Sequence, residues 1–346
     1  MTSLTRTAVV GYGYWGPNIA RNLADIPGSE LAAICDKRPD RLSRAKSRYP
    51  VAMCTSDFDR ILSDPSIDAV AIVTPVATHT QLAVRALQAG KHVWVAKPLA
   101  TDSSRAAEVI EEAQKRNLVL LVDHTFAYMG AVRRITELMR ANELGELYYY
   151  DSVRVNLGLF QHDVSVLWDL AIHDLSILAS WVREQPVSVS CTAVAHLQGH
   201  PADIAYLTLR SPSSFVAHIH VSWLSPIKIR QTLLGGSSKM VVFNDLDPIE
   251  KIKVYDRGVS TREDLVGTDL VPLAYRRTGD VWLPQFDLTE ALRVEAQHFL
   301  RCIVEGERAE TGGEEALKVI QILEAAEVSL KKAGAAVSID EGVVVL

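Results

Sequence analysis

The chain has 346 residues, of which 36 are Lys or Arg and 42 are Asp or Glu, and its formal net charge is −6. This length suggests about two domains, each large enough to bury its own hydrophobic core. An acidic chain without a long run of Lys and Arg has no strong electrostatic reason to bind nucleic acid or an anionic membrane surface. We therefore expect neither of these partners, and any phosphate-bearing ligand must be bound locally.

The four cysteines are scattered along the chain without a CxxC spacing. This pattern predicts neither a structural zinc site nor a disulfide framework, and it favours a reducing, cytoplasmic location. The first glycine, Gly11, comes too early for a cleavable secretion signal to precede it. No apolar run approaches the roughly 18 to 20 residues needed to span a bilayer.

Short apolar runs alternate with amphipathic stretches between residues 6 and 123. Runs without period-2 alternation are typical of strands that helices cover on both faces. The pattern therefore predicts an N-terminal domain over residues 1–124 with the doubly wound parallel sheet of the Rossmann fold. The predicted strands are 8–10, 31–35, 69–73, 92–95 and 119–122.

The pattern changes after about residue 125, where a helical stretch at 130–142 is followed by alternating sequences. We expect residues 125–346 to form an α/β domain with an open, largely antiparallel sheet, and we expect the last two helices, 289–304 and 314–333, to pack back on the body of the protein. An open sheet makes a homodimer or homotetramer a more natural expectation than a monomer. The predicted strands are 146–156, 186–196, 205–210, 215–224 and 227–234.

A glycine-rich motif lies directly between the first predicted strand and a helix. This context favours a dinucleotide-binding loop over an ordinary strand-to-helix turn. Gly11 allows the tight turn, Gly13 lets a pyrophosphate approach the backbone, and Gly16 lets helix and strand pack closely. The start of the helix supplies N–H donors to the phosphates. The candidate cofactor-binding residues of this loop are Gly11, Tyr12, Gly13, Tyr14, Trp15 and Gly16.

Asp36 ends the second apolar run, 20 residues after Gly16. A carboxylate there accepts hydrogen bonds from a ribose diol and repels a 2′-phosphate, which favours NAD over NADP. Lys37 and Arg38 follow immediately and weaken this preference, so NADP remains an alternative. The next loop facing the cofactor follows the run at 69–73, although its residues also fit as loop and cap residues. Its candidate cofactor contacts are Thr74, Pro75 and His79.

The candidate catalytic residues come from two segments. Lys97 follows the strand at 92–95, at the carboxyl end of the sheet, and Pro98 restricts its backbone to an extended conformation. Asp169 and His173 are four residues apart in a helical pattern over 164–182 and share one face. A histidine suits removal of a hydroxyl proton, and a lysine ammonium can polarise the oxygen and stabilise alkoxide charge. An exposed acid–histidine pair would show the same spacing, but the nucleotide-binding context favours catalysis.

These motifs, with the segments DHTFAYMGAVRRI and YYYDSVRVNLGLFQHDVSVLWDLAIHDLSI, resemble the glucose–fructose oxidoreductase, inositol dehydrogenase and MocA (Gfo/Idh/MocA) family. Within it the chain is most similar to the branch that oxidises or reduces nucleotide-linked sugars at C3. The resemblance implies a Rossmann domain and a second domain whose open sheet commonly serves as the oligomer interface. It assigns Lys97 to the family's Glu-Lys-Pro motif, Asp169 to the acid of its Asp-x-x-x-His element, and His173 to the acid/base.

One residue departs from the family pattern, because Glu-Lys-Pro reads Ala96-Lys97-Pro98 in this chain. The alanine removes a carboxylate beside the lysine, and with it a favourable charge interaction. A slowed enzyme, altered chemistry and an introduced substitution are all compatible with the alanine.

The candidate substrate contacts lie around these motifs, although a purely structural role fits each flanking residue as well. His218 and His220 alternate on one sheet face, but no third metal ligand accompanies them, so we expect no metal site. The candidate substrate-binding residues are Lys97, Tyr128, Arg154, Asn156, Gln161 and His173.

The sequence thus predicts an NAD-dependent dehydrogenase that oxidises the C3 hydroxyl of a nucleotide-activated hexose resembling UDP-N-acetylglucosamine. Three alternatives remain: an NADPH-dependent reductase of 3-keto sugars in deoxysugar or antibiotic biosynthesis, a redox-neutral enzyme such as an epimerase, and a non-catalytic NAD-binding homologue.

Overall fold

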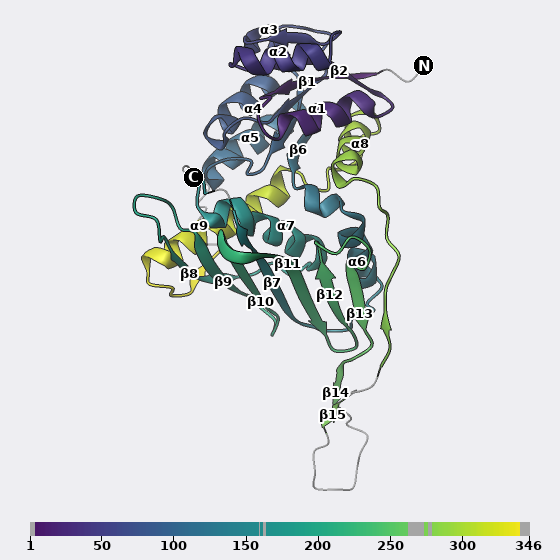
Figure 1. The fold of residues 1–346 in the computed structure, drawn as a ribbon, viewed down its shortest axis with the longest axis vertical. Coiled ribbons are helices and arrows are strands. Elements are labelled where there is room, and N and C mark those ends of the chain that lie inside the picture. Colours follow the sequence, from purple (N-terminus) through teal and green to yellow (C-terminus); the bar gives the residue numbers. More distant parts are fainter. Residues whose placement is uncertain (1–3, 159, 162–163, 262–272, 276–278, 340–346) are drawn as a thin grey trace. The chain divides into compact units, whose positions relative to one another are not determined.

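The computed structural model describes residues 4–158, 160–161, 164–261, 273–275 and 279–339. The chain forms two compact units, which are described one at a time (Figure 1). The first comprises Met1–Tyr128 and Thr289–Gln321, and the second Met129–Leu288 and Ile322–Leu346. Within the described residues, no helix combines the length and the apolar character that crossing a membrane requires.

The first unit contains a six-stranded parallel sheet in the order β3-β2-β1-β4-β5-β6. This order confirms the predicted doubly wound fold, and it reverses direction between β1 and β4, where such sheets bind ligands at the carboxyl ends of their strands. The very short β3 was not predicted, because three residues give too little pattern. The strands are β1 (Thr5–Val10), β2 (Ser29–Cys35), β3 (Met53–Thr55), β4 (Ala69–Ile72), β5 (His92–Ala96) and β6 (Leu120–Asp123).

Helices connect these strands, and a helix from far along the chain completes the core. Phe299 of α8 (Ala291–Val304) is fully buried, and its ring centroid lies 5.7 Å from that of Trp94 in β5. Thus α8 belongs to the hydrophobic core of the first unit. The other helices of this unit are α1 (Gly16–Asp25), α2 (Pro39–Arg48), α3 (Phe58–Leu62), α4 (His79–Gln88) and α5 (Ser103–Arg116), with short 3₁₀ turns at Val76–Thr78 and Thr125–Tyr128.

The second unit contains a nine-stranded sheet in the order β16-β13-β12-β11-β7-β10-β9-β8-β17. Its neighbouring strands pair antiparallel except β7 and β10, which are parallel, so the predicted largely antiparallel sheet is confirmed. The strands are β7 (Leu147–Leu157), β8 (Ser188–Val194), β9 (Ile204–Arg210), β10 (Val216–Ser222), β11 (Leu224–Gly236), β12 (Met240–Asn244), β13 (Ile252–Tyr255), β16 (Val281–Trp282) and β17 (Val337–Ser338). A separate hairpin pairs β14 (Val259–Thr261) with β15 (Leu273–Tyr275).

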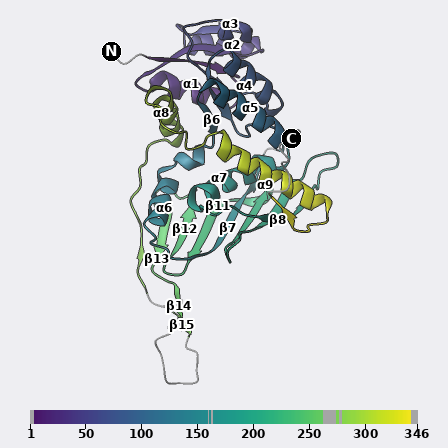
Figure 2. The same ribbon diagram turned by 180° about the vertical axis from the view of Figure 1, so that it is seen from behind.

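One face of this sheet is covered by helices of the same unit, as Figures 1 and 2 show for α6 (Gly130–Arg140) and α7 (Ile172–Trp181). The alternation over 215–224 predicted this covered face correctly, since its five apolar residues are each at most 5% exposed. The last helix, α9 (Gly313–Lys331), begins in the first unit and ends in the second.

The helical segment that carries Asp169 and His173 is not uniform. One turn of π-helix, Leu167–Ala171, precedes α7, whereas the sequence pattern predicted a regular helix from residue 164. Such a turn accommodates one extra residue, and it occurs frequently at functional sites. Asp169 lies within the π turn and His173 lies in the first turn of α7.

Candidate active site

The glycine loop between β1 and α1 has the geometry that its sequence predicts. Gly11 has φ +98°, and a Cβ on it would lie 2.3 Å from the carbonyl oxygen of Val73. A Cβ on Gly16 would lie 2.1 Å from the carbonyl oxygen of Gly11. Both positions therefore require glycine. At Gly13 the nearest atom to such a Cβ is a guanidinium nitrogen of Arg41, 3.4 Å away, so a cationic side chain lies over the loop.

Asp36 lies at the carboxyl end of β2, beside this loop, and is only 7% exposed. Its carboxylate accepts hydrogen bonds from the backbone N–H of Tyr12 (2.7 Å), from that of Arg38 (2.9 Å) and from the Arg41 guanidinium (3.3 Å). A carboxylate offers about four acceptor sites, so these three donors leave room for one more. A ribose hydroxyl matches that remaining site.

Three cationic residues surround Asp36. Arg41 was not among the residues predicted from sequence, although its place on the first turn of the helix after Asp36 was a usable signal. Arg38 forms a two-pronged ion pair with Asp40 at 3.0 Å, and Lys37 is exposed. Positive charge therefore surrounds the Asp36 carboxylate, and the predicted preference for NAD over NADP stays a prediction.

The loop after β4 is fixed by a buried histidine. His79 is 1% exposed, and its two ring nitrogens lie 2.8 Å from the Pro98 carbonyl oxygen and 2.7 Å from that of Thr74. Burial lowers the pKa of His79. The ring thus ties this loop to the segment that carries Lys97, while Pro75 is exposed. Contacts from Thr74, Pro75 or His79 to a cofactor stay predictions.

Lys97 follows β5 at the carboxyl edge of the parallel sheet, as predicted. The neighbouring strand β6 ends with Asp123, which pairs in register with Ala96. His124 follows and is 3% exposed, and its burial together with the charge of Lys97 lowers its pKa to about 4. His124 is therefore neutral at physiological pH, and the charge of Lys97 acts on Asp123 as well.

The indole of Trp15 points inward from the glycine loop. Its Nε1–H donates a hydrogen bond of 2.5 Å to Asp123 Oδ2, while the neighbouring Tyr14 side chain is 93% exposed. Tyr128 is fully buried, and its hydroxyl lies 3.0 Å from Thr311 Oγ1 within the same unit. These bonds give the half-buried Trp15 and the buried Tyr128 polar partners within the protein, and their predicted ligand contacts stay predictions.

The second unit positions the acid and the histidine. Trp223 Nε1–H donates a hydrogen bond of 3.2 Å to Asp169 Oδ2, which fixes one oxygen of that carboxylate. The carbonyl oxygen of His173 accepts a bond of 2.7 Å from the Ser176 hydroxyl. Both Asp169 and His173 are half-buried, so solvent and small ligands can reach them.

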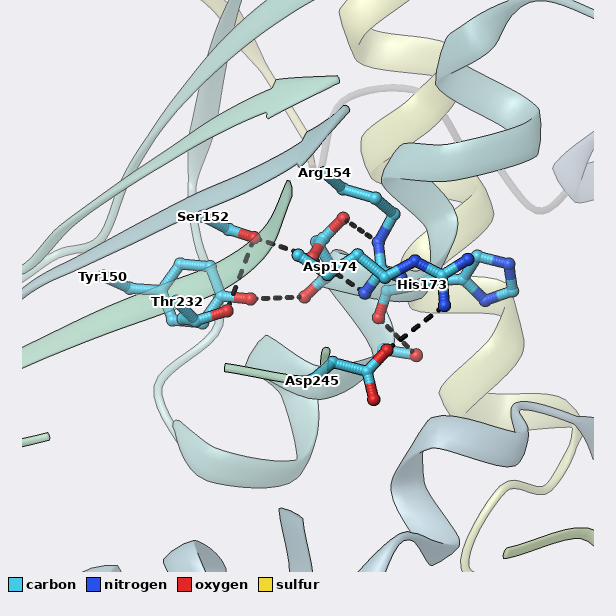
Figure 3. Close-up of polar contacts among 9 residues, drawn as sticks. Tyr150, Ser152, Arg154, His173, Asp174, Thr232 and Asp245 are labelled. Atoms are coloured by element: carbon cyan, nitrogen blue, oxygen red, sulfur yellow. Dashed lines mark hydrogen bonds and ion pairs between the residues drawn. The ribbon is translucent and has the colours of Figure 1, made fainter. Parts of the chain in front are cut away.

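A buried polar cluster lies next to His173 (Figure 3). The Asp174 carboxylate accepts two bonds from the Arg154 guanidinium, at 2.7 and 3.2 Å, and one of 2.6 Å from the Ser152 hydroxyl. The Tyr150 hydroxyl donates a bond of 3.0 Å to the Asp174 carbonyl, and burial together with the Asp174 charge raises the pKa of Tyr150. This cluster anchors the first turn of α7 to the central strand β7.

Arg154 therefore forms an ion pair with Asp174 in which the two side chains are only 4% and 2% exposed. Its predicted contact with substrate stays a prediction. Residues 150, 152, 154 and 156 alternate along β7 and so share one sheet face. Asn156 extends this face toward the end of the strand and is half-buried, as is Gln161.

Within the part of the chain that the structure describes, no three His, Cys, Asp or Glu side chains gather closely enough to hold a metal ion. His218 and His220 instead flank Tyr206 on the sheet, with ring centroids 6.4 and 4.3 Å from the tyrosine ring.

The first unit therefore has the parallel sheet, strained glycine loop and carboxylate of a dinucleotide-binding oxidoreductase domain. Its residues fit the cofactor, because the loop carries a cationic side chain above Gly13 and Asp36 keeps one acceptor site. A family model described as an oxidoreductase family with an NAD-binding Rossmann fold matches residues 5–124, and the Gfo/IDH/MocA C-terminal domain matches residues 132–241. The chain belongs to the Gfo/Idh/MocA family of oxidoreductases.

Two relatives are named for nucleotide-activated sugars. UDP-N-acetylglucosamine 3-dehydrogenase of Acidithiobacillus ferrooxidans is 29% identical over 303 residues, which cover 86% of this chain and 88% of the relative. A solved structure of that enzyme superposes with a TM-score of 0.80 at 25% identity, over 94% of this chain and 98% of the other. dTDP-3,4-didehydro-2,6-dideoxy-α-D-glucose 3-reductase of Saccharopolyspora spinosa is 24% identical over 72% of this chain and 78% of the relative.

Proposed function

We propose that this chain oxidises the C3 hydroxyl of a nucleotide-activated hexose resembling UDP-N-acetylglucosamine, with NAD as the oxidant. The observation that carries the proposal is that Lys97, Asp169 and His173 are all present in a chain whose similarity to a UDP-N-acetylglucosamine 3-dehydrogenase extends over 86% of its length. A protein that only binds nucleotide has no chemical need for this combination of a lysine and an acid–histidine pair.

The proposed roles follow from the chemistry of each side chain. Bound NAD supplies the hydride acceptor. His173 accepts the hydroxyl proton as general base, and Lys97 donates a hydrogen bond to the same oxygen and stabilises its developing negative charge. Asp169, fixed by Trp223, orients the histidine or the lysine.

The cofactor contacts are proposed from the first unit alone. The glycine loop and the start of α1 receive the pyrophosphate, and Asp36 receives the ribose diol through its remaining acceptor site. Arg41 contributes positive charge above Gly13.

The proposed substrate contacts divide into two groups. Asn156 and Gln161 are half-buried residues at and beyond the end of β7, so they are available to bind sugar hydroxyls. Arg154 and Tyr128 are buried and bonded within their own units, so we propose that they act by holding other residues in place.

The direct test mixes the purified protein with NAD and a panel of UDP- and TDP-hexoses and follows the nicotinamide absorbance. We expect reduction with a UDP-N-acetylglucosamine-like sugar. His173→Asn should lower kcat about 10²- to 10⁴-fold, which is the usual contribution of a general base, while the Kd for NADH stays close to that of the parent. Near-parental turnover by His173→Asn would refute the assignment of the base.

The reverse reaction, in which NADPH reduces a 3-keto sugar, is the second candidate. The relative that is a 3-reductase of a deoxysugar supports it, as do the cationic residues around Asp36. Tighter binding of NADPH than of NADH would favour this reductase over the dehydrogenase.

A further inference from the structure

Trp223 is the single residue between two strands that lie on opposite sides of β7 (Figure 1). β10 ends at Ser222 and pairs parallel with β7, and β11 begins at Leu224 and pairs antiparallel with it. The chain therefore crosses the carboxyl end of β7 at Trp223. The same end of β7 is where the chain leaves the sheet toward Gln161.

Both backbone groups of Trp223 are hydrogen-bonded at this crossing. Its N–H donates a bond of 2.9 Å to the Asp203 carbonyl oxygen, which extends the pairing of β10 with β9. Its carbonyl oxygen accepts a bond of 3.1 Å from the Gly158 N–H, just beyond the end of β7. The backbone of Trp223 is therefore fixed on both sides, and the pairing of the strands determines where its side chain lies.

The indole of Trp223 connects the acid of the proposed site with the residues that follow β7. Trp223 is only 1% exposed, and its Nε1–H donates a bond of 3.2 Å to Asp169 Oδ2. Its ring lies edge-to-face against the half-buried Phe160, with the two ring centroids 5.8 Å apart. A Cβ on Gly158 would lie 3.1 Å from both the indole Cδ1 and Asn156 Nδ2, so glycine lets these two groups approach the backbone.

The bond from the indole suits the control of a carboxylate. An indole has one polar hydrogen, and this hydrogen needs an acceptor when the ring is buried. In Trp223 the acceptor is a carboxylate, and hydrogen bonds to charged acceptors are stronger than those between neutral groups. The backbone N–H of Asp169 donates a bond of 3.0 Å to the Ser165 carbonyl oxygen. The indole therefore restricts the direction of a carboxylate whose backbone is already held.

We propose that Trp223 is a positioning residue that holds the Asp169 carboxylate in one arrangement with Asn156, Gly158 and Phe160. This inference rests on the proposed function in taking Asp169 and Asn156 as residues of the active site. The two parts of the side chain have separate effects. The N–H acts on Asp169 and therefore on kcat, whereas the ring acts on the residues after β7 and therefore on the KM for the sugar.

The first test is a double-mutant cycle on kcat with Trp223→Phe and Asp169→Ala. Trp223→Phe should lower kcat about 10- to 100-fold, the value of one hydrogen bond to a charged group, while the Kd for NADH stays parental. In the Asp169→Ala background the same change should lower kcat less than about 3-fold, because the carboxylate through which Trp223 acts is gone. Losses that multiply in the double variant would overturn the proposal, since a merely structural residue costs the same in both backgrounds.

Trp181 provides the matched control. It lies in the same unit, is 3% exposed, and its Nε1–H donates a bond of 3.1 Å to the Val132 carbonyl oxygen. Trp181→Phe therefore makes the same change in volume and removes one buried indole bond, without involving Asp169. It should change kcat less than about 3-fold. Equal losses of kcat in Trp181→Phe and Trp223→Phe would show that packing alone is responsible.

The KM for the sugar tests the role of the ring. Trp223→Phe should raise this KM about 2- to 10-fold even in the Asp169→Ala background, the value of one aromatic pair, because Phe160 loses part of its support. A parental KM in that background would contradict the role of the ring. If Trp223→Phe does not fold, Gly158→Ala takes its place in the cycle, because the added methyl group displaces the indole edge.

A second arm needs no substrate, so it distinguishes a failure of this inference from a failure of the proposed function. The six tryptophans give six indole N–H peaks in a ¹⁵N–¹H spectrum, and Trp223→Phe identifies the Trp223 peak by its loss. Asp169→Ala should move that peak upfield and speed its exchange with water, because the N–H loses its acceptor, and should leave the Trp181 peak in place. An unmoved Trp223 peak would overturn the inference, whatever the substrate proves to be.

Discussion

Asp36 is the residue that we propose decides the preference between NAD and NADP. Its carboxylate accepts three hydrogen bonds, from Tyr12, Arg38 and Arg41. This single negative charge lies next to several cationic side chains and partly neutralises them. Removing it should leave those cations facing the ribose. The proposal therefore makes the preference for NAD a local electrostatic property that a single substitution can change without altering the fold.

Asp36→Ser should weaken NADH binding about 10-fold or more, because it removes a charged acceptor of the ribose hydroxyls. The same change should strengthen NADPH binding, because Arg41 loses its carboxylate partner and, with the exposed Lys37, can then receive the 2′-phosphate. Fluorescence titration with both cofactors measures the ratio of the two Kd values. The half-buried Asp64, in the same unit, provides the control Asp64→Ser, and an equal ratio in Asp36→Ser and Asp64→Ser would refute the assignment.

The sequence predicted individual residues correctly where the backbone conformation alone requires a particular amino acid. Gly11 and Gly16 were predictable because their strain and crowding are local consequences of a strand-to-helix turn. The partners of His79 and Arg154 were not, because those bonds join residues 19 and 20 positions apart through the packing of separate elements.

At the scale of elements, the buried ion pair between Arg154 and Asp174 joins β7 to the helix that carries His173. Both side chains are nearly inaccessible, and the Asp174 carboxylate has three hydrogen bonds from Ser152 and Arg154 (Figure 3). Such a pair is costly to break, because the remaining partner is a buried charge without compensation. The pair therefore fixes the position of α7 against the sheet.

Arg154→Met should lower the free energy of unfolding by about 3–5 kcal/mol, as measured by urea denaturation. Arg134 forms a partly exposed ion pair with Glu137 in the same unit, and Arg134→Met should cost less than about 1 kcal/mol. If the two variants lost equal stability, the ion pair between Arg154 and Asp174 would not be what fixes α7 against the sheet.

The elements themselves were predictable in different degrees. The alternation over 215–224 defined the covered face of β10, because a period of two is a direct consequence of strand geometry. The π turn at Leu167–Ala171 was not predictable, because one inserted residue leaves the apolar pattern of a helix almost unchanged. β12 and β13 were missed, since strands of five and four residues carry too short a pattern.

At the scale of the whole molecule, the chain combines an NAD-binding Rossmann unit with a unit built on a nine-stranded sheet. Helix α8 belongs to the first unit and places Glu295 and Phe299 in the core of that unit. More than 160 residues separate these two side chains from Tyr128, the last residue of the unit's first segment. The sequence predicted this helix, but it could not predict which strands the helix packs against, because those contacts depend on the tertiary structure. The family assignment explains the class of reaction, and the substrate remains the central proposal.

The most direct test of that proposal uses UDP-N-acetylglucosamine labelled with deuterium at C3, together with NAD and the unmodified protein. Oxidation at C3 transfers that deuterium to the nicotinamide, so the NADH formed should be heavier by one mass unit in a mass spectrum. NADH of ordinary mass, formed with turnover, would place the oxidation at another carbon. No NADH from this sugar, with NADH binding intact, would contradict the proposed dehydrogenase reaction on UDP-N-acetylglucosamine.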